Sequence, residues 1–196
     1  IAAAAVFLFL PDSQGRRLNK VLANTLSCNS QYLRQIMQQY AQGKSDDLAY
    51  RLARRNAHNA DAALSTTLAN MLMEPGHFRK DADMGFRFLV LSHTLLSYLS
   101  GLGAHRDTQL PPQMREQLIE GAGRTIADSI DLIAQGLVNR QPVAVQSDDE
   151  EALASALEQM PDDIDESQRL VQTQLALICR QLGPLRTLAA HLIKTP

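Results

Sequence analysis

The stretch from Asp47 to Glu74, DLAYRLARRNAHNADAALSTTLANMLME, holds the longest uninterrupted helical pattern in this chain. Small and apolar residues recur along it at steps of three and four, so they fall on one side of a helix. They are Ala53, Ala57, Ala60, Leu64, Leu68 and Met71. Because alanine side chains let a neighbouring helix come close, we expect this helix to sit inside a bundle.

The composition also favours helices. Of the 196 residues, 45% are hydrophobic and only 5% are aromatic, with no Trp. Runs of Val, Ile, Thr and aromatic residues, which are typical of strands, are missing from the sequence. A chain of this length can bury a core as one domain. The sequence therefore predicts an all-α fold, an antiparallel bundle of five or six helices.

The remaining helices are predicted from the same period and from start and stop signals. Segment 84–104 is apolar nearly all round but carries too many polar groups for lipid, so we expect it to be the central buried helix. Gly183-Pro184 should kink or split the last helix. The other predicted helices cover 16–41, 112–139 and 148–159, and the last one begins after Asp163.

Capping and turn signals separate these helices. Pro75-Gly76 should end the Asp47–Glu74 helix, and residues 77–83, HFRKDAD, are predicted to be a polar loop. The acidic run from Ser147 to Glu151 is expected to start a helix and to face solvent. The expected caps are Ser45 or Asp46, Ser147 with Glu150, and Asp163 with Glu166.

The first ten residues, IAAAAVFLFL, are apolar but too few to cross a bilayer, which needs about 20 residues. Three basic residues follow within ten positions, Arg16, Arg17 and Lys20, as on the cytoplasmic side of a membrane helix. The alternative is an ordinary buried helix end. We expect the end of a transmembrane helix at 1–11, the bundle core at 12–140, an acidic loop and short helix at 141–163, and a C-terminal helix packing on the bundle at 164–196.

Charge is unevenly distributed along the chain. The net charge of −2 argues against a nucleic-acid partner, which would require a positive excess. Residues 1–60 hold 8 Lys or Arg against 3 Asp or Glu, whereas residues 141–196 hold 4 against 9. This asymmetry predicts a basic face and an acidic face, or an attraction between the two ends. Cys28 and Cys179 lack metal-type spacing, so we expect two reduced, packed thiols.

A polar face lies opposite the apolar seam of the Asp47–Glu74 helix. Its members are Arg51, Arg54, Arg55, His58, Asp61 and Ser65. A second polar stripe, His93, Ser97 and Ser100, follows the same spacing on segment 84–104. If the two helices are adjacent, His58 and His93 could approach each other and form an anion or carboxylate pocket. The alternative is an interhelical hydrogen-bond network that fixes the register of the helices.

The sequence lacks the signatures of known catalytic and cofactor sites. His58 and Asp61 form an H-x-x-D pair, but no second matching helix completes a bundle-type metal site. No GxSxG, GxGxxG or GxxxxGK[ST] motif is present. We therefore expect no catalytic residue, no metal and no cofactor, and a protein that is not an enzyme.

Three stretches resemble one known family. The runs LAYRLARRNAHNADAALSTTLANML, FRFLVLSHTLLSYLSGLGAHR and FLPDSQGRRLNKVLANTL are similar to the C-terminal cytoplasmic part of the bacterial inner-membrane family YccS/YhfK, within the fusaric-acid-resistance (FUSC) superfamily. The resemblance covers the chain from Val6 to Arg106. The family motif falls on Arg54, Arg55, Asn56, His58, Asn59 and Asp61, and on Ser92, His93, Ser97, His105 and Arg106.

The resemblance implies the tail of a larger efflux transporter, similar to exporters of aromatic carboxylic acids. We expect a cytoplasmic helical domain at the bacterial inner membrane that acts in assembly, coupling or small-anion sensing. Its expected partners are the membrane part of the same protein, anionic lipid headgroups near the N-terminus, and further copies in a homo-oligomer. The alternative is a self-standing soluble helical interaction module without a transport role.

Overall fold

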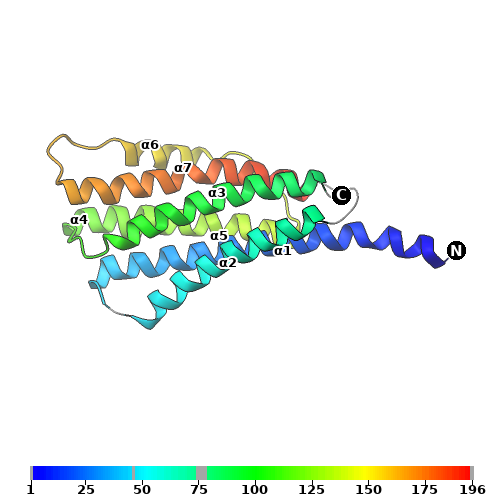
Figure 1. Cartoon of the computed structure of the whole chain (residues 1–196). Helices are drawn as coiled ribbons and strands as arrows, with labels where there is room; N and C mark the ends of the chain where they lie inside the picture. The colour runs from blue at the N-terminus through cyan, green and yellow to red at the C-terminus, as the bar shows by residue number, and fades with distance from the viewer. Residues whose placement is uncertain (1, 46, 74–78, 195–196) are drawn as a thin grey trace.

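The computed structural model describes residues 2–45, 47–73 and 79–194. Every regular element in these ranges is helical, and helices that follow one another pack antiparallel, which confirms the predicted all-α bundle (Figure 1). Because α4, η1 and α5 continue one another, the described chain forms six rods. The elements are α1 (Ala2–Gln42), α2 (Leu48–Met73), α3 (Arg79–Ala104), α4 (Pro112–Arg115), η1 (Glu116–Gly123), α5 (Arg124–Asn139), α6 (Asp148–Glu158) and α7 (Glu166–Lys194).

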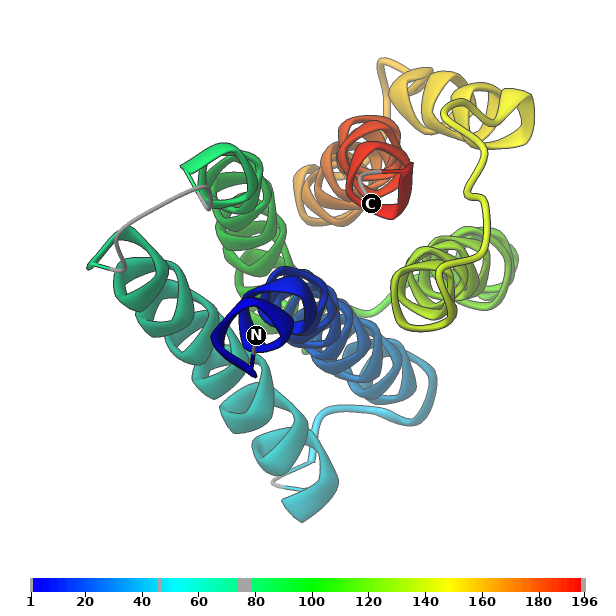
Figure 2. The ribbon, with the colours of Figure 1, turned by 90° about the vertical axis from the view of Figure 1, so that its right-hand side faces the viewer.

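Four of the rods form a central bundle, and two flank it. Seen end on, α1, α3, α7 and the rod that contains α5 surround the core, whereas α2 and α6 lie at opposite corners (Figure 2). Helix α1 packs against α2, α3, α5 and η1, and α3 packs against α1, α2 and α7, so both hold central positions. The prediction that α3 is buried nearly all round is wrong. Helix α3 exposes a strip that includes Arg87, Val90 and His93, because these residues recur on one side of it.

Helix α1 is continuous from Ala2 to Gln42, and its first turns project beyond the rest of the bundle (Figure 1). The prediction of a helix that starts only at Arg16 is therefore wrong. A proline such as Pro11 removes one backbone hydrogen bond, but the turns on both sides of it can keep the helix together. Within the bundle, Leu18, Leu22 and Leu26 are fully buried on α1.

Helix α2 lies at the edge of the bundle rather than inside it. Its predicted apolar seam is confirmed, since all six seam residues from Ala53 to Met71 are buried. Glycines on α3 allow a close approach: a Cβ atom added at Gly103 would lie 2.7 Å from the hydroxyl oxygen of Tyr50. Asp47 caps α2 in place of Ser45, because its Oδ1 accepts from the Ala49 N–H at 2.8 Å. Asp46 and Pro75-Gly76 lie outside the described residues.

Two other helix starts differ from the predictions. Helix α3 begins at Arg79, so most of the predicted loop 77–83 is helical, and an ion pair between Asp83 and Arg87 at 3.4 Å supports its first turns. Helix α7 is capped by Asp165, which accepts from the Ser167 N–H at 3.0 Å, and not by Asp163. The cap of α6 is confirmed, with the Glu150 N–H 3.4 Å from the Ser147 hydroxyl.

Two helical rods each contain an irregular segment and still remain continuous. Helix α7 is not split at Pro184, because the neighbouring Leu182 and Leu185 are fully buried and hold both halves in the core. Segment η1 is wound as a π-helix, a form the sequence did not indicate. Gly123 at its end lies directly against the sulfur of Met37, so a side chain at this position would force the Met37 side chain to move.

Candidate functional site

The polar face predicted from the sequence lies on the solvent side of α2. We call this surface the α2 polar face. Its predicted members Arg51, Arg54, Arg55, His58 and Ser65 are exposed, and Asp61 is partly buried. Asn56 and Asn59 of the family motif are exposed as well. They face outward because the alanines and leucines between them pack against α1 and α3. The α2 polar face is therefore an outer surface of the bundle and not the interior site that we predicted.

The two polar stripes meet at Asp61 and His93. Asp61 Oδ2 lies 3.0 Å from His93 Nδ1, with the Asp61 side chain 15% exposed and the His93 side chain 68% exposed. The other carboxylate oxygen of Asp61 is buried and has no hydrogen-bond partner among the described residues. Ser97, which is also exposed, donates its hydroxyl to the His93 carbonyl at 3.0 Å. The α2 side chain that binds His93 is thus Asp61, whereas His58 is exposed on the outer side of α2.

His105 and Arg106 lie at the far end of α3 and have different surroundings. His105 is exposed, whereas the Arg106 guanidinium stacks 4.2 Å from the centre of the Tyr50 ring. Arg106 also donates to the Gly103 carbonyl at 2.8 Å. The Tyr50 hydroxyl lies 3.5 Å from that of Tyr32 on α1. Arg106 therefore joins α2 to the end of α3, and Tyr50 continues the contact to α1.

The basic residues that were predicted to lie near a membrane are found where α1 leaves the bundle. Arg16, Arg17 and Lys20 are exposed there, while Leu18 and Asn19 between them are buried. Neighbouring residues on a helix point in different directions, so this alternation is the one expected for a helix with one face in the bundle. The three basic side chains lie on the outer side of the first turns of α1 that pack in the bundle.

A second polar cluster joins α6 to α7, and the sequence did not predict it. Its centre is a buried ion pair in which Arg186 Nη2 donates to Glu150 Oε1 at 2.6 Å, with the two side chains only 6% and 8% exposed. Arg186 Nε donates to both oxygens of the same carboxylate at 3.0 and 2.8 Å. Two-point contacts of this kind are the strong form of the Arg–carboxylate interaction. The expectation that the acidic run around Glu150 faces solvent is thus wrong for Glu150 itself.

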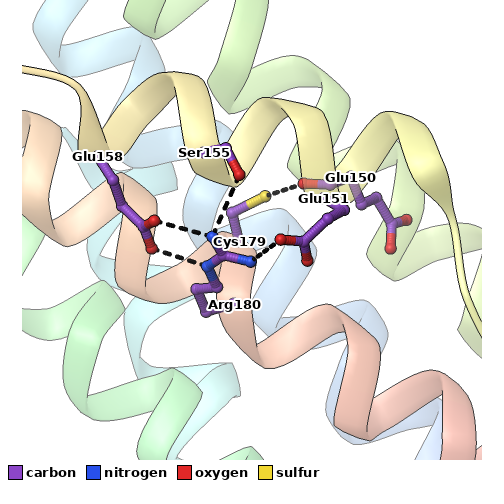
Figure 3. Close-up of polar contacts among 6 residues, drawn as sticks. All are labelled: Glu150, Glu151, Ser155, Glu158, Cys179 and Arg180. Carbon is purple, nitrogen blue, oxygen red and sulfur yellow. Dashed lines mark hydrogen bonds and ion pairs between the residues drawn. The ribbon is translucent and has the colours of Figure 1, made fainter.

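A second arginine of α7 extends this cluster at the surface (Figure 3). Arg180 donates to both oxygens of Glu158 at 2.7 and 2.8 Å and to Glu151 at 2.5 Å. The pKa of Arg180 is raised by its hydrogen bonds to these carboxylates, and the pKa of Glu158 is lowered by its hydrogen bond to Arg180. We call the five residues Glu150, Glu151, Glu158, Arg180 and Arg186 the α6 clamp.

Cys179 lies beneath α6, next to the α6 clamp (Figure 3). Its thiol donates to the Glu150 carbonyl at 3.5 Å. Burial, and secondarily the Glu150 charge, raises the pKa of Cys179 to about 12. A thiol with this pKa is neutral near pH 7 and is a poor nucleophile, because the thiolate is the reactive form. Cys28 and Cys179 are both free, as predicted.

A groove of about 460 Å³ runs along the clamp between α6 and α7. Val145, Ala154 and Pro184 supply its apolar lining, and Asp148 and Glu151 supply carboxylates. Its volume falls within the range of small-molecule sites, about 300 to 1,000 Å³. Within residues 2–45, 47–73 and 79–194, no group of three or more His, Cys, Asp or Glu side chains is placed to hold a metal ion.

Three curated proteins are similar to this chain. The first, inner membrane protein YccS of Escherichia coli, is 35% identical over 199 residues, which cover 100% of this chain and 26% of YccS. An uncharacterized protein of Haemophilus influenzae is 40% identical over 73% of this chain and 21% of its own length. Uncharacterized protein ORF2 of Neisseria gonorrhoeae is 34% identical over 53% of this chain and 25% of its own length.

The whole chain is homologous to one part of an inner membrane protein. It spans about a quarter of the length of the curated relatives that it matches. No family model matches the chain, and no solved structure matches it. Among the described residues, none of the helices has both the length and the apolar character needed to cross a bilayer.

Proposed function

We propose that this chain is the cytoplasmic helical domain of an inner-membrane efflux transporter of the fusaric-acid-resistance type. Its role in that transporter is mechanical. Helix α1 transmits movements of the membrane part to the rest of the bundle, and the domain carries out no catalysis. The similarity to YccS over the whole chain supports a place in an inner membrane protein. The resemblance of residues 6–106 to the superfamily supports efflux, with aromatic carboxylic acids as the substrate class.

The main observation behind this proposal is that α1 is one continuous helix that extends from outside the bundle into it. This helix combines the apolar run at its start, outside the bundle, with the central position inside the bundle (Figure 1). A continuous helix is stiff, because each turn is hydrogen-bonded to the next. A displacement of its membrane end would therefore reach α2, α3 and α5 together, which suits a coupling element.

Vesicle binding tests the attachment through α1. Each Lys or Arg near an anionic membrane surface contributes about 1 kcal/mol, so replacing Arg16, Arg17 and Lys20 with Gln should lower the binding constant by roughly two orders of magnitude. The measurement is co-sedimentation of the chain with vesicles that contain phosphatidylserine. A set of vesicles made only of neutral lipid separates the electrostatic contribution from that of the apolar run.

A matched control removes the same number of charges from the opposite end of the bundle. Lys44 follows the end of α1, Arg115 lies in α4, and Arg124 lies beside residues 34–41 of α1. Their replacement with Gln should leave vesicle binding nearly unchanged. Equal losses in the two triple variants would show a general charge effect and no oriented attachment. Unchanged vesicle binding by the variant that lacks Arg16, Arg17 and Lys20 would contradict the proposal.

The alternative is a self-standing helical module in which residues 2–10 belong to the core. A chain that begins at Asp12 separates the two functions. Among the side chains that the structure describes, the buried residues of α1 start at Leu18, so we expect the shortened chain to keep its helix content and melting temperature. Aggregation or a large loss of helicity, followed by circular dichroism, would favour the alternative.

A further inference from the structure

The outward surface of α2 combines positive charge with exposed leucines. From Leu48 to Ala60 the helix contains Arg51, Arg54 and Arg55 and no acidic residue. Leu48 and Leu52, one turn apart, are 69% and 44% exposed. The two leucines give this basic helix face an apolar component that a partner could cover. This surface therefore has the chemistry of a docking site for an acidic, partly apolar partner.

The outward surface of α6 has the complementary chemistry. Residues 141–168 contain nine acidic residues and no basic residue. The five acidic residues of α6 exceed the two arginines of the clamp, so the region keeps a net negative charge. Asp148 and Asp149 at the start of α6 are exposed. The groove beside them offers the apolar side chains of Val145, Ala154 and Pro184.

Charge decides which of these surfaces can meet. Two α2 surfaces placed face to face would bring arginines together, and two α6 surfaces would bring carboxylates together, and both arrangements are unfavourable. An α2 surface against an α6 surface pairs opposite charges. In one copy the two helices lie at opposite corners of the bundle, so they cannot meet within the same chain (Figure 2).

We propose that α2 of one copy docks on α6 and its groove in a second copy, so that the chains associate head to tail. Leu48 and Leu52 would enter the groove, and Arg54 and Arg55 would face Asp148 and Asp149. A contact between two different surfaces repeats from copy to copy and forms a ring if the rotation closes. Because both helices run along the bundle, the copies lie side by side.

Two charge-reversed variants test this contact. Arg54→Glu with Arg55→Glu reverses the α2 surface, and Asp148→Lys with Asp149→Lys reverses the α6 surface. Sedimentation velocity in mild detergent should show the unaltered chain as an oligomer and each variant alone as a monomer. An equimolar mixture should associate again, because the unaltered α2 of one variant meets the unaltered α6 of the other. All these residues are exposed, and circular dichroism checks that both variants stay folded.

Ionic strength and a control variant complete the experiment. The oligomer should dissociate between about 0.01 M and about 1 M salt, as the Debye length falls from about 30 Å to about 3 Å. Arg115→Glu with Arg124→Glu makes the same change of charge away from α2 and should leave the oligomer intact. A monomeric unaltered chain, dissociation of this control, or a mixture that stays monomeric would overturn the proposal.

This inference does not depend on the proposed membrane attachment. The variants leave residues 1–20 unchanged, so vesicle binding by each of them reports on attachment separately. Loss of association with retained vesicle binding concerns the α2 contact alone.

Discussion

The two flanking helices, α2 and α6, are held on the same bundle by different forces. Helix α2 has 26 residues and packs through a seam of alanine, leucine and methionine. Helix α6 has 11 residues, of which only Glu150, Ala154 and Leu157 are buried, and the α6 clamp holds it on α7. A long helix can bury enough apolar surface to stay in place, whereas a short one is marginal without further contacts. The difference leaves Arg54 and Arg55 exposed on α2, whereas part of the charge of α6 is paired within the chain.

The largest effect should come from breaking the buried pair of α6. Arg186→Met would leave the Glu150 carboxylate buried without its partner, which costs about 3–5 kcal/mol. Unfolding in urea measures the change. Adding Glu150→Leu should recover most of it, because an apolar pair of similar volume needs no charge compensation. Arg180→Met, at a side chain 34% exposed, should cost much less, because water screens its ion pairs. Equal losses in both arginine variants would contradict this account of α6.

The apolar seam of α2 should give the next largest effect. Leu64 is fully buried, so Leu64→Ala should lower the free energy of unfolding by about 3 kcal/mol through lost burial and a cavity. The matched control is Leu72→Ala on the same helix, where the side chain is 55% exposed and little should change. If Leu64→Ala costs no more than Leu72→Ala, the seam does not hold α2.

Cys179 provides a smaller and pH-dependent test of α6. In the unfolded chain its thiol ionises near the usual cysteine pKa of about 8.5, whereas in the folded chain the pKa is about 12. Between these values only the unfolded state releases the proton, so the contribution of this group, complete below about pH 8.5, is lost as the pH rises towards 12. Stability should therefore fall less steeply with pH above 8.5 in Cys179→Ala than in the unaltered chain. Parallel curves would mean that α6 does not shield this thiol.

The smallest effects are expected on the α2 polar face. Arg54→Ala and His58→Ala replace exposed side chains, so each should change the free energy of unfolding by less than about 0.5 kcal/mol. Thermal melting with a panel of aromatic carboxylates and phosphorylated metabolites tests the predicted anion site in the same variants. A saturable rise in melting temperature that both substitutions abolish would show that the α2 polar face binds an anion. Loss of stability in both variants would mean that these residues have structural contacts.

The fold class and most of the helices could be predicted from the sequence, because they depend on local periodicity. The seam from Ala53 to Met71 follows from steps of three and four, and the Ser147 cap from its place before Glu150. The exact helix starts could not be predicted in the same way. Asp47 and Asp165 each have polar neighbours that could equally occupy the N-cap position. The prediction that Cys28 and Cys179 are free thiols also followed from their spacing in the sequence.

The candidate sites needed the tertiary structure. The period of α2 determined that its arginines share one side, but only the packing of α1 and α3 decided that this side faces outward. The cap motif marks Glu150 as part of a helix start, but it does not indicate a buried ion pair, which forms because Arg186, 36 residues later, donates to its carboxylate. Periodicity is a property of neighbouring residues and can be read from the chain. The pairing of distant charges depends on which helices meet, and that is fixed only when the whole core packs.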